Sequence, residues 1–293
     1  MYYFVSFCIY LLSLLPFWLL YGISNVLYFV VFHVVGYRKT VVFTNISKSF
    51  PQKTSAEVSV IAKDFYKSFC DQIVETVKLM TMSSAQFAQR IPGNWDFLNK
   101  YQQNNQSVYV VLGHRFNWEW ANVAFSLNSP IIVAGLYLPL SNKVFDKLML
   151  KIRSRFGATY IPVTHLLPGL KKLEGRNYVM GFLSDQTPSN LNLSIWYNFL
   201  HQATPFITGP EKAAKRAGAA VVYLAIKKLK RGHYEIVMEE ICENAKDTPY
   251  GFVTKACTRR LQDEMQQQPE NWLWSHRRWK RKPTGNEKII NLD

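Results

Sequence analysis

His114 follows a predicted buried strand and precedes a predicted helix with a carboxylate in its first turn. The run from Val110 to Trp120 reads Val-Val-Leu-Gly-His-Arg-Phe-Asn-Trp-Glu-Trp, which puts Glu119 five residues after His114. Ligands of open α/β sheets bind at the carboxyl ends of strands, where this histidine is expected. A histidine there can remove a proton from a hydroxyl, and a carboxylate can orient the ring and stabilise its cation. This spacing predicts acyl transfer without an enzyme nucleophile; alternatively, His114 is a polar loop residue and Glu119 an acid favoured by the helix dipole.

Two later groups of polar residues are expected near strand ends. Lys151, Arg153 and Arg155 cluster before Gly157, and arginine binds phosphate through paired hydrogen bonds. The alternative for this cluster is a solvated helix face. Asp185 and Gln186 follow the predicted strand Tyr178 to Leu183. They are candidates for the same site, and the alternative is a turn closed by an aspartate side chain.

Several other chemistries lack their motifs. The chain has no Gly-x-Ser-x-Gly nucleophile elbow, no glycine-rich phosphate loop and no dinucleotide fingerprint. Its histidines do not pair with carboxylates at metal-site spacing, and its four cysteines form no CxxC pair. We therefore predict no metal site and no disulfide framework.

Basic and aromatic residues gather near the end of the chain. The cations are Arg277, Arg278, Lys280, Arg281 and Lys282, and Trp272, Trp274 and Trp279 lie among them. Such cations suit anionic lipid head groups or an acidic carrier protein. The tryptophans are typical of a membrane interface, and aromatics with cations also bind single-stranded nucleic acid. We predict no nucleic-acid partner, because that function would leave the apolar N-terminus and His114 unexplained.

The N-terminal segment is the strongest compositional feature. The chain has 293 residues and a formal charge of +15, yet residues 1–37 contain no Lys, Arg, Asp or Glu. About 20 apolar residues suffice to cross a bilayer. Basic residues follow at Arg38 and Lys39, which favours a cytoplasmic position for the rest of the chain. We predict a membrane anchor at 1–37 that spans the bilayer. The alternative is a re-entrant or surface-bound element, because Pro16 and Gly22 interrupt the run.

Two further regions follow the anchor. Residues 38–100 form a basic juxtamembrane segment with a turn at Asn45 to Pro51 and an amphipathic helix from Glu57 to about Met80. Residues 101–293 alternate short β-rich runs with helical stretches, which predicts an α/β domain with a mostly parallel central sheet flanked by helices.

In their order along the chain, these motifs resemble the lipid A biosynthesis late acyltransferases, within the wider group of His-x4-acid glycerolipid acyltransferases. Near the end, Trp274-Ser-His-Arg-Arg-Trp-Lys280 is similar to that family's Trp-x-His-Arg-Arg-aromatic-Lys signature. This chain departs from the usual pattern at Arg115 and Phe116. The other matching elements are Asn45 to Pro51, His114 to Glu119, Arg153 with Arg155, Asp185-Gln186 and Phe206 to Lys215.

The resemblance implies a membrane-bound enzyme that moves a fatty acyl chain from an acyl carrier protein to a hydroxyl of a lipid A precursor. It implies the inner membrane, with the catalytic domain on the cytoplasmic side, and no cofactor. His114 would be the general base and Glu119 its partner. Arg153, Arg155, Asp185 and Arg277 would bind or shape the substrate site. Another lipid acceptor, or a non-catalytic protein that binds anionic lipid, remains an alternative.

Overall fold

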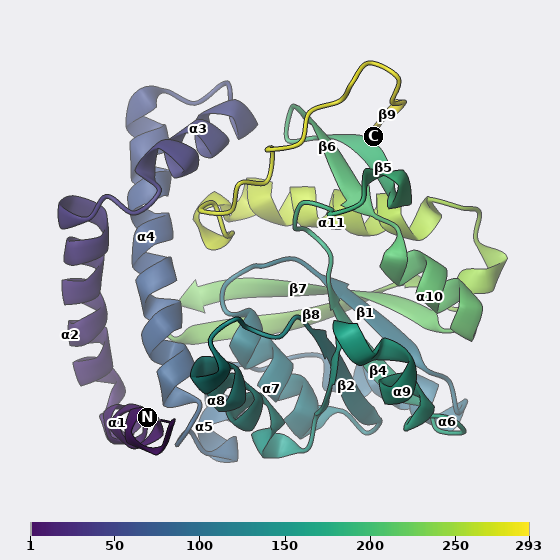
Figure 1. The fold of residues 1–293 in the computed structure, drawn as a ribbon, viewed down its shortest axis with the longest axis horizontal. Coiled ribbons are helices and arrows are strands. Elements are labelled where there is room, and N and C mark those ends of the chain that lie inside the picture. Colours follow the sequence, from purple (N-terminus) through teal and green to yellow (C-terminus); the bar gives the residue numbers. More distant parts are fainter. Residues whose placement is uncertain (1, 293) are drawn as a thin grey trace.

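A six-stranded sheet forms the centre of the protein, whose computed structural model describes residues 2–292 (Figure 1). The strand order is β3-β2-β4-β1-β7-β8, and only the β7–β8 pair is antiparallel. This arrangement confirms the predicted α/β class with a mostly parallel sheet. The strands are β1 (Val108–Leu112), β2 (Ile132–Tyr137), β3 (Thr159–Pro162), β4 (Tyr178–Leu183), β7 (Ala220–Lys230) and β8 (His233–Cys242).

Alternating side chains of the sheet enter two separate apolar cores. Tyr109 and Val221 belong to the core that also contains Leu261 of α11 (Phe252–Gln267), whereas Val110 and Val222 belong to the core beneath α7 (Trp118–Asn128). Successive strand residues point to opposite faces, so helices are needed on both sides. The other helices of this part are α5 (Ser84–Arg90), α6 (Asn99–Gln103), α8 (Lys143–Arg153), α9 (Leu166–Lys171) and α10 (Gly209–Ala217).

The predicted amphipathic helix is α4 (Ser55–Lys78). Thr54 and Glu57 exchange the two hydrogen bonds of a capping box, which satisfies backbone donors at the start of the helix. Its apolar side packs on the domain through Val58, Ile61 and Phe65. The turn expected from Asn45 to Pro51 is wrong, because α3 (Lys39–Ser49) continues through most of it.

Three helical segments precede α3. They are α1 (Tyr2–Leu14), α2 (Phe17–Tyr28) and a π-helical continuation (Phe29–Val34). Pro16, which has no N–H to donate, precedes α2, where a helix can begin without that donor. By length and composition, Phe17–Val34 is the one stretch of the described chain apolar enough to cross a membrane.

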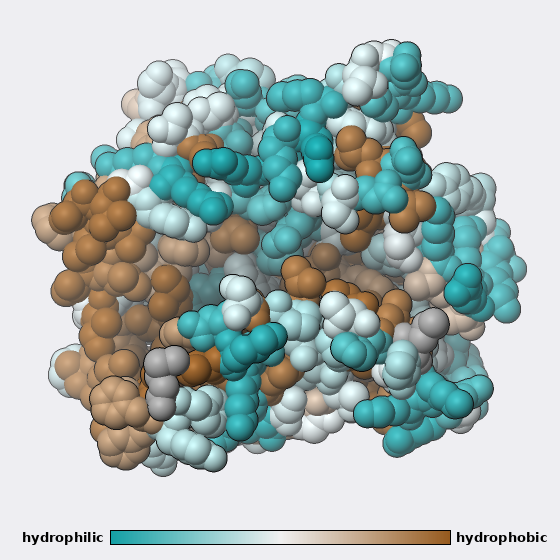
Figure 2. Space-filling view, viewed as in Figure 1, coloured by the Kyte–Doolittle hydropathy of each residue, from teal (hydrophilic) through white to brown (hydrophobic). Residues whose placement is uncertain are grey.

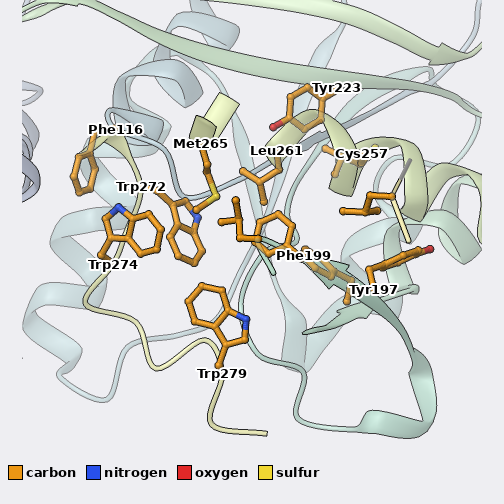
Figure 3. Packing of buried hydrophobic residues seen from close by; sticks show 14 of the residues in the cluster. Phe116, Tyr197, Phe199, Tyr223, Cys257, Leu261, Met265, Trp272, Trp274 and Trp279 are labelled. Carbon is orange, nitrogen blue, oxygen red and sulfur yellow. The ribbon is translucent and has the colours of Figure 1, made fainter. Parts of the chain in front are cut away.

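A small second sheet and the C-terminal segment complete the fold. The sheet has the order β6-β5-β9, from β5 (Ser194–Phe199), β6 (Gln202–Ile207) and β9 (Ile289–Asn291). The tryptophans that we expected at a membrane interface are buried instead: Trp272 is 1%, Trp274 0% and Trp279 7% exposed. Figure 3 shows the three tryptophans in the same buried cluster as Phe116 and Met265.

Candidate active site

The pairing of β1 with β4 brings the two principal polar residues together. The strands are parallel neighbours, and Leu112 lies opposite Leu183 at their carboxyl ends. His114 and Asp185 each follow two residues later, so they meet at the same edge of the sheet. Gly113 allows this approach, because a Cβ there would come within 2.6 Å of Leu261 and 3.3 Å of Asp185.

Asp185 is buried and accepts three hydrogen bonds. His114 Nδ1 lies 2.6 Å from Oδ1, and Oδ2 accepts from the His114 backbone N–H at 2.8 Å and from Trp272 Nε1 at 2.7 Å. Burial alone would raise the pKa of this carboxyl. The positive field of His114 and the hydrogen bonds outweigh burial and lower the pKa to about 2. Asp185 is therefore an anion at neutral pH.

The contact with Asp185 determines which ring nitrogen of His114 is basic. A carboxylate only accepts hydrogen bonds, so Nδ1 carries the proton. In the neutral ring, Nε2 is then free to take up a proton. Gln186, which is exposed, places its Nε2 3.2 Å from His114 Nε2 and can donate to it. This geometry is that of a general base held by a buried carboxylate.

Glu119 lies in the same region but does not contact the histidine ring through a hydrogen bond. Its partner is Arg153, which donates from Nε at 2.8 Å to Oε2 and from Nη2 to Oε1. Trp118 connects this pair to the centre: its Nε1 donates to Glu119 at 3.2 Å, and its ring meets His114 edge-on at 5.1 Å. We expected Glu119 to hold the ring. In the structure Asp185 has that contact, because β4 ends beside β1, whereas Glu119 in the first turn of α7 pairs with Arg153.

An apolar cavity of about 330 Å³ adjoins Glu119. This size lies in the usual range of ligand pockets, roughly 300–1,000 Å³. Helices α1, α4, α7 and α8 supply its walls, and Ile73 and Phe145 on its lining are exposed. The residues on it are Ile9, Phe69, Gln72, Ile73, Thr76, Val77, Trp118, Glu119, Phe145, Leu148, Met149 and Ile152. The arrangement suits a hydrocarbon chain whose polar end lies at the carboxylate.

The other two predicted substrate-binding residues, Arg155 and Arg277, make no hydrogen bond to His114 or Asp185. Arg155 donates from Nη1 to the carbonyls of Leu79 and Met82, at 2.8 and 2.7 Å, which satisfies acceptors left unpaired at the end of α4. The side chain of Arg277 is exposed, and its backbone carbonyl accepts from Thr187. The structure therefore brings His114, Asp185 and, through Trp118, Glu119 with Arg153 together, but brings neither Arg155 nor Arg277 to them.

Several residues near the site were not singled out individually from the sequence. Asn45 donates from Nδ2 to the carbonyls of Trp274 and His276, both at 3.0 Å, and so holds the segment that supplies Trp272. Burial lowers the pKa of His276 to about 4, although Asp185 acts in the opposite direction. Arg278, predicted on the basic surface, is 0% exposed and lies over the Phe206 ring. The signal for Asn45 was its place in the motif order, and that for His276 and Arg278 was the motif from Trp274 to Lys280.

Buried contacts with the rest of the protein hold the loop between β1 and α7 in place. Arg115 points away from the site, donating to the Gln268 carbonyl at 2.9 Å, and Phe116 is fully buried. Asn117 begins α7 by accepting from the Trp120 N–H at 3.1 Å, and its Nδ2 donates to Glu75 at 2.8 Å. Arg115 and Phe116, the two positions at which the chain departs from the family pattern, are therefore buried in the core.

Comparison with known proteins identifies the class. Residues 1–281 match the family described as bacterial lipid A biosynthesis acyltransferase. The chain belongs to this family, and it is an acyltransferase. A lipid A biosynthesis palmitoleoyltransferase of Escherichia coli (strain K12) is 22% identical over 257 residues, which cover 86% of this chain and 82% of that protein. A lipid A biosynthesis acyltransferase of Shigella flexneri matches with the same identity and coverage.

Proposed function

We propose that this enzyme transfers a fatty acyl chain from an acyl carrier protein thioester to a hydroxyl group of a lipid A precursor. The acyl transfer follows from family membership. The observation that carries the mechanism is the hydrogen bond of 2.6 Å between His114 Nδ1 and the Asp185 carboxylate, which leaves Nε2 as the base.

The reaction needs one proton carrier. Nε2 of His114 removes the proton of the acceptor hydroxyl as the oxygen attacks the thioester carbonyl carbon. The carbon–sulfur bond of the resulting tetrahedral intermediate then breaks, and the proton on Nε2 passes to the departing sulfur. The products are an ester and a free thiol. Throughout, Asp185 stays ionised and stabilises the imidazolium, as its lowered pKa favours.

The cavity beside Glu119 supports a place for the fatty chain. Its walls are apolar, and the Glu119–Arg153 pair lies where the chain would end in a polar group. Arg153 is predicted to contact phosphate on the acceptor or on the carrier arm. It carries about a quarter of its side-chain surface exposed, so such a contact is open to it.

The net charge of the chain is consistent with an acidic carrier protein and anionic lipid as partners. A chain of +15 attracts both an acidic carrier protein and anionic membrane lipid. With the apolar N-terminal segment, this supports a position at the inner membrane, with the catalytic part on the cytoplasmic side. The predicted contacts of Arg155 and Arg277 with substrate require rearrangement of Arg155 but not of the exposed Arg277.

The test is an acyl-transfer assay on membranes with a lipid A precursor and an acyl carrier protein thioester. Wild type is expected to transfer, and His114→Ala to lose at least about a hundredfold in rate, the range typical of a general base. Asp185→Asn should fall nearly as far, whereas Glu119→Gln should retain more activity. His165→Ala, at an exposed histidine, is the matched control. Near-wild-type transfer by His114→Ala would contradict the mechanism.

A change of acceptor is tested separately. If the enzyme acylates another lipid, lipid A from a deletion strain will keep its acylation pattern in mass spectra. A loss of one acyl chain from lipid A supports the proposed acceptor. This measurement distinguishes a wrong acceptor from a wrong base, because it does not use the His114 variant.

A further inference from the structure

Polar contacts attach α2 to the rest of the protein along its length. Lys78 Nζ donates to the carbonyls of Ser13 and Leu15, at 2.8 and 2.9 Å, where α1 gives way to α2. One turn further on, the Tyr21 hydroxyl donates to Glu75 at 2.9 Å. Figure 1 shows the consequence: α2 lies alongside α4, and α1 is seen end-on at the foot of α2.

An ion pair between the buried Asp71 and the exposed Arg231 reinforces this attachment. The Ser24 hydroxyl donates to Asp71 at 2.6 Å, and Arg231 donates to the same carboxylate at 2.6 to 3.0 Å. Arg231 also donates to Asn25 of α2 at 2.8 Å. The side of α2 that faces α4 therefore lies against a polar seam, which includes the charged side chains of Asp71 and Arg231.

The outer side of the same helices is apolar and uncovered. Among the described residues, fifteen exposed large hydrophobic side chains lie between Tyr3 and Tyr37, with Tyr3 82%, Phe4 72% and Trp18 71% exposed. Figure 2 shows a hydrophobic area over α2 that extends to α1. The set is Tyr3, Phe4, Phe7, Tyr10, Leu11, Leu12, Leu14, Trp18, Ile23, Val26, Phe29, Val30, Val34, Val35 and Tyr37. We call it the N-terminal apolar face.

Lysines border this face, and the segments that form it contain no Asp or Glu. Lys39 lies 4.0 Å from the Phe32 ring centre, and Lys147 of α8 lies 4.5 Å from that of Tyr2. Residues 1–37 contain no charged side chain. An apolar face with basic residues at its border matches a bilayer surface of anionic lipid, whose acyl chains and head groups supply the two complements.

We propose that the N-terminal apolar face binds an anionic bilayer in the plane of the membrane, with α2 remaining on α4 rather than crossing. A crossing α2 that stays on α4 would carry Asp71 and Arg231 to hydrocarbon depth, where charged side chains are strongly disfavoured. Alternatively it would break the seam with α4 and leave Glu75 and Lys78 without these partners. In-plane binding retains every contact.

This mode of binding has a consequence for the site. Ile9 of α1 lines the cavity beside Glu119, together with residues of α4 and α8. A membrane held against α1 then lies next to one wall of that cavity. If the acceptor is a membrane lipid, as the proposed function requires, its hydrocarbon chains can approach the cavity from the lipid phase without crossing open water.

Depth measurements with nitroxide labels separate the two orientations. Labels are placed singly at Trp18→Cys, Val26→Cys and Val34→Cys, all more than 60% exposed, in a full-length chain whose native cysteines are replaced. The protein is bound to vesicles of phosphatidylethanolamine and phosphatidylglycerol. In-plane binding predicts equal depths within about 10 Å of the head groups. Crossing predicts a spread of about 24 Å along these 16 residues.

Controls make each outcome decisive. A label at Tyr250→Cys, an exposed aromatic in the loop before α11, should remain in water. A Val26 label at the bilayer centre would overturn the proposal, as would three labels in water or spin coupling between two copies of the chain. Vesicle partition should fall about tenfold or more for Trp18→Glu, the change that about 1.4 kcal/mol gives, and stay unchanged for Tyr250→Glu. No acyl donor is used, so the result is independent of the proposed reaction.

Discussion

The two aromatic-rich ends of the chain have similar residue types and opposite environments. Trp18 in the N-terminal apolar face is 71% exposed, whereas Trp274 in the C-terminal segment is 0% exposed. Both lie near basic residues, and both were expected at a membrane. Composition describes what a side chain can contact, but it does not say whether the protein itself supplies that contact.

The backbone around each end explains the difference. Residues 272–279 form irregular structure whose carbonyls are bound by Asn45, and their rings pack on Phe50 and on one another. The N-terminal residues form helices, and a helix on a protein surface buries only one side. That side of α2 is already used by the polar seam with α4. Trp18, on the other side of α2, therefore points outwards.

The largest expected contrast is in stability. Trp274→Ala should lower the free energy of unfolding by about 3–5 kcal/mol, because it removes a fully buried indole and leaves a cavity. Chemical denaturation of the detergent-solubilised protein measures this change, with Tyr250→Ala as the exposed control. A loss below about 1 kcal/mol would show that the C-terminal cluster is not part of the core.

The next effect is a dependence of stability on pH. It is expected at the C-terminal end only, because Trp272 donates a hydrogen bond to Asp185. The pKa of Asp185 in the folded protein, about 2, lies below its ordinary value of 3.8, so folding favours the ionised form. The resulting stabilisation, about 2 kcal/mol, is complete above pH ~4 and disappears as the pH falls towards 2. Unfolding of wild type and Asp185→Asn, compared across this range, measures it. A difference independent of pH would contradict the assignment.

The smallest effect is expected at the N-terminal face. Trp18→Ala should change the free energy of unfolding by less than about 0.5 kcal/mol, since the ring is mostly exposed before and after folding. The same denaturation experiment as for Trp274→Ala gives the comparison. A loss as large as that of Trp274→Ala would mean that Trp18 packs against the protein and is unavailable to lipid.

Local patterns predicted most elements of this fold. Tyr178–Leu183 is a strand with the bounds expected, and α4 begins at the capping box that Thr54 and Glu57 indicate. The small sheet of β5, β6 and β9 was not predicted. Strand β9 lies 90 residues beyond β5 along the chain, and such a pairing leaves no periodic signal in either segment.

For the site, the sequence by itself determined that His114, Glu119 and Asp185 lie at carboxyl ends of strands or at the start of the next helix. Spacing along the chain does this, because each residue follows its strand directly. Only the tertiary structure decided which carboxylate meets the ring. Strand order places β4 beside β1, so Asp185, 71 residues away, reaches His114, while Glu119, five residues away, turns with α7 towards Arg153.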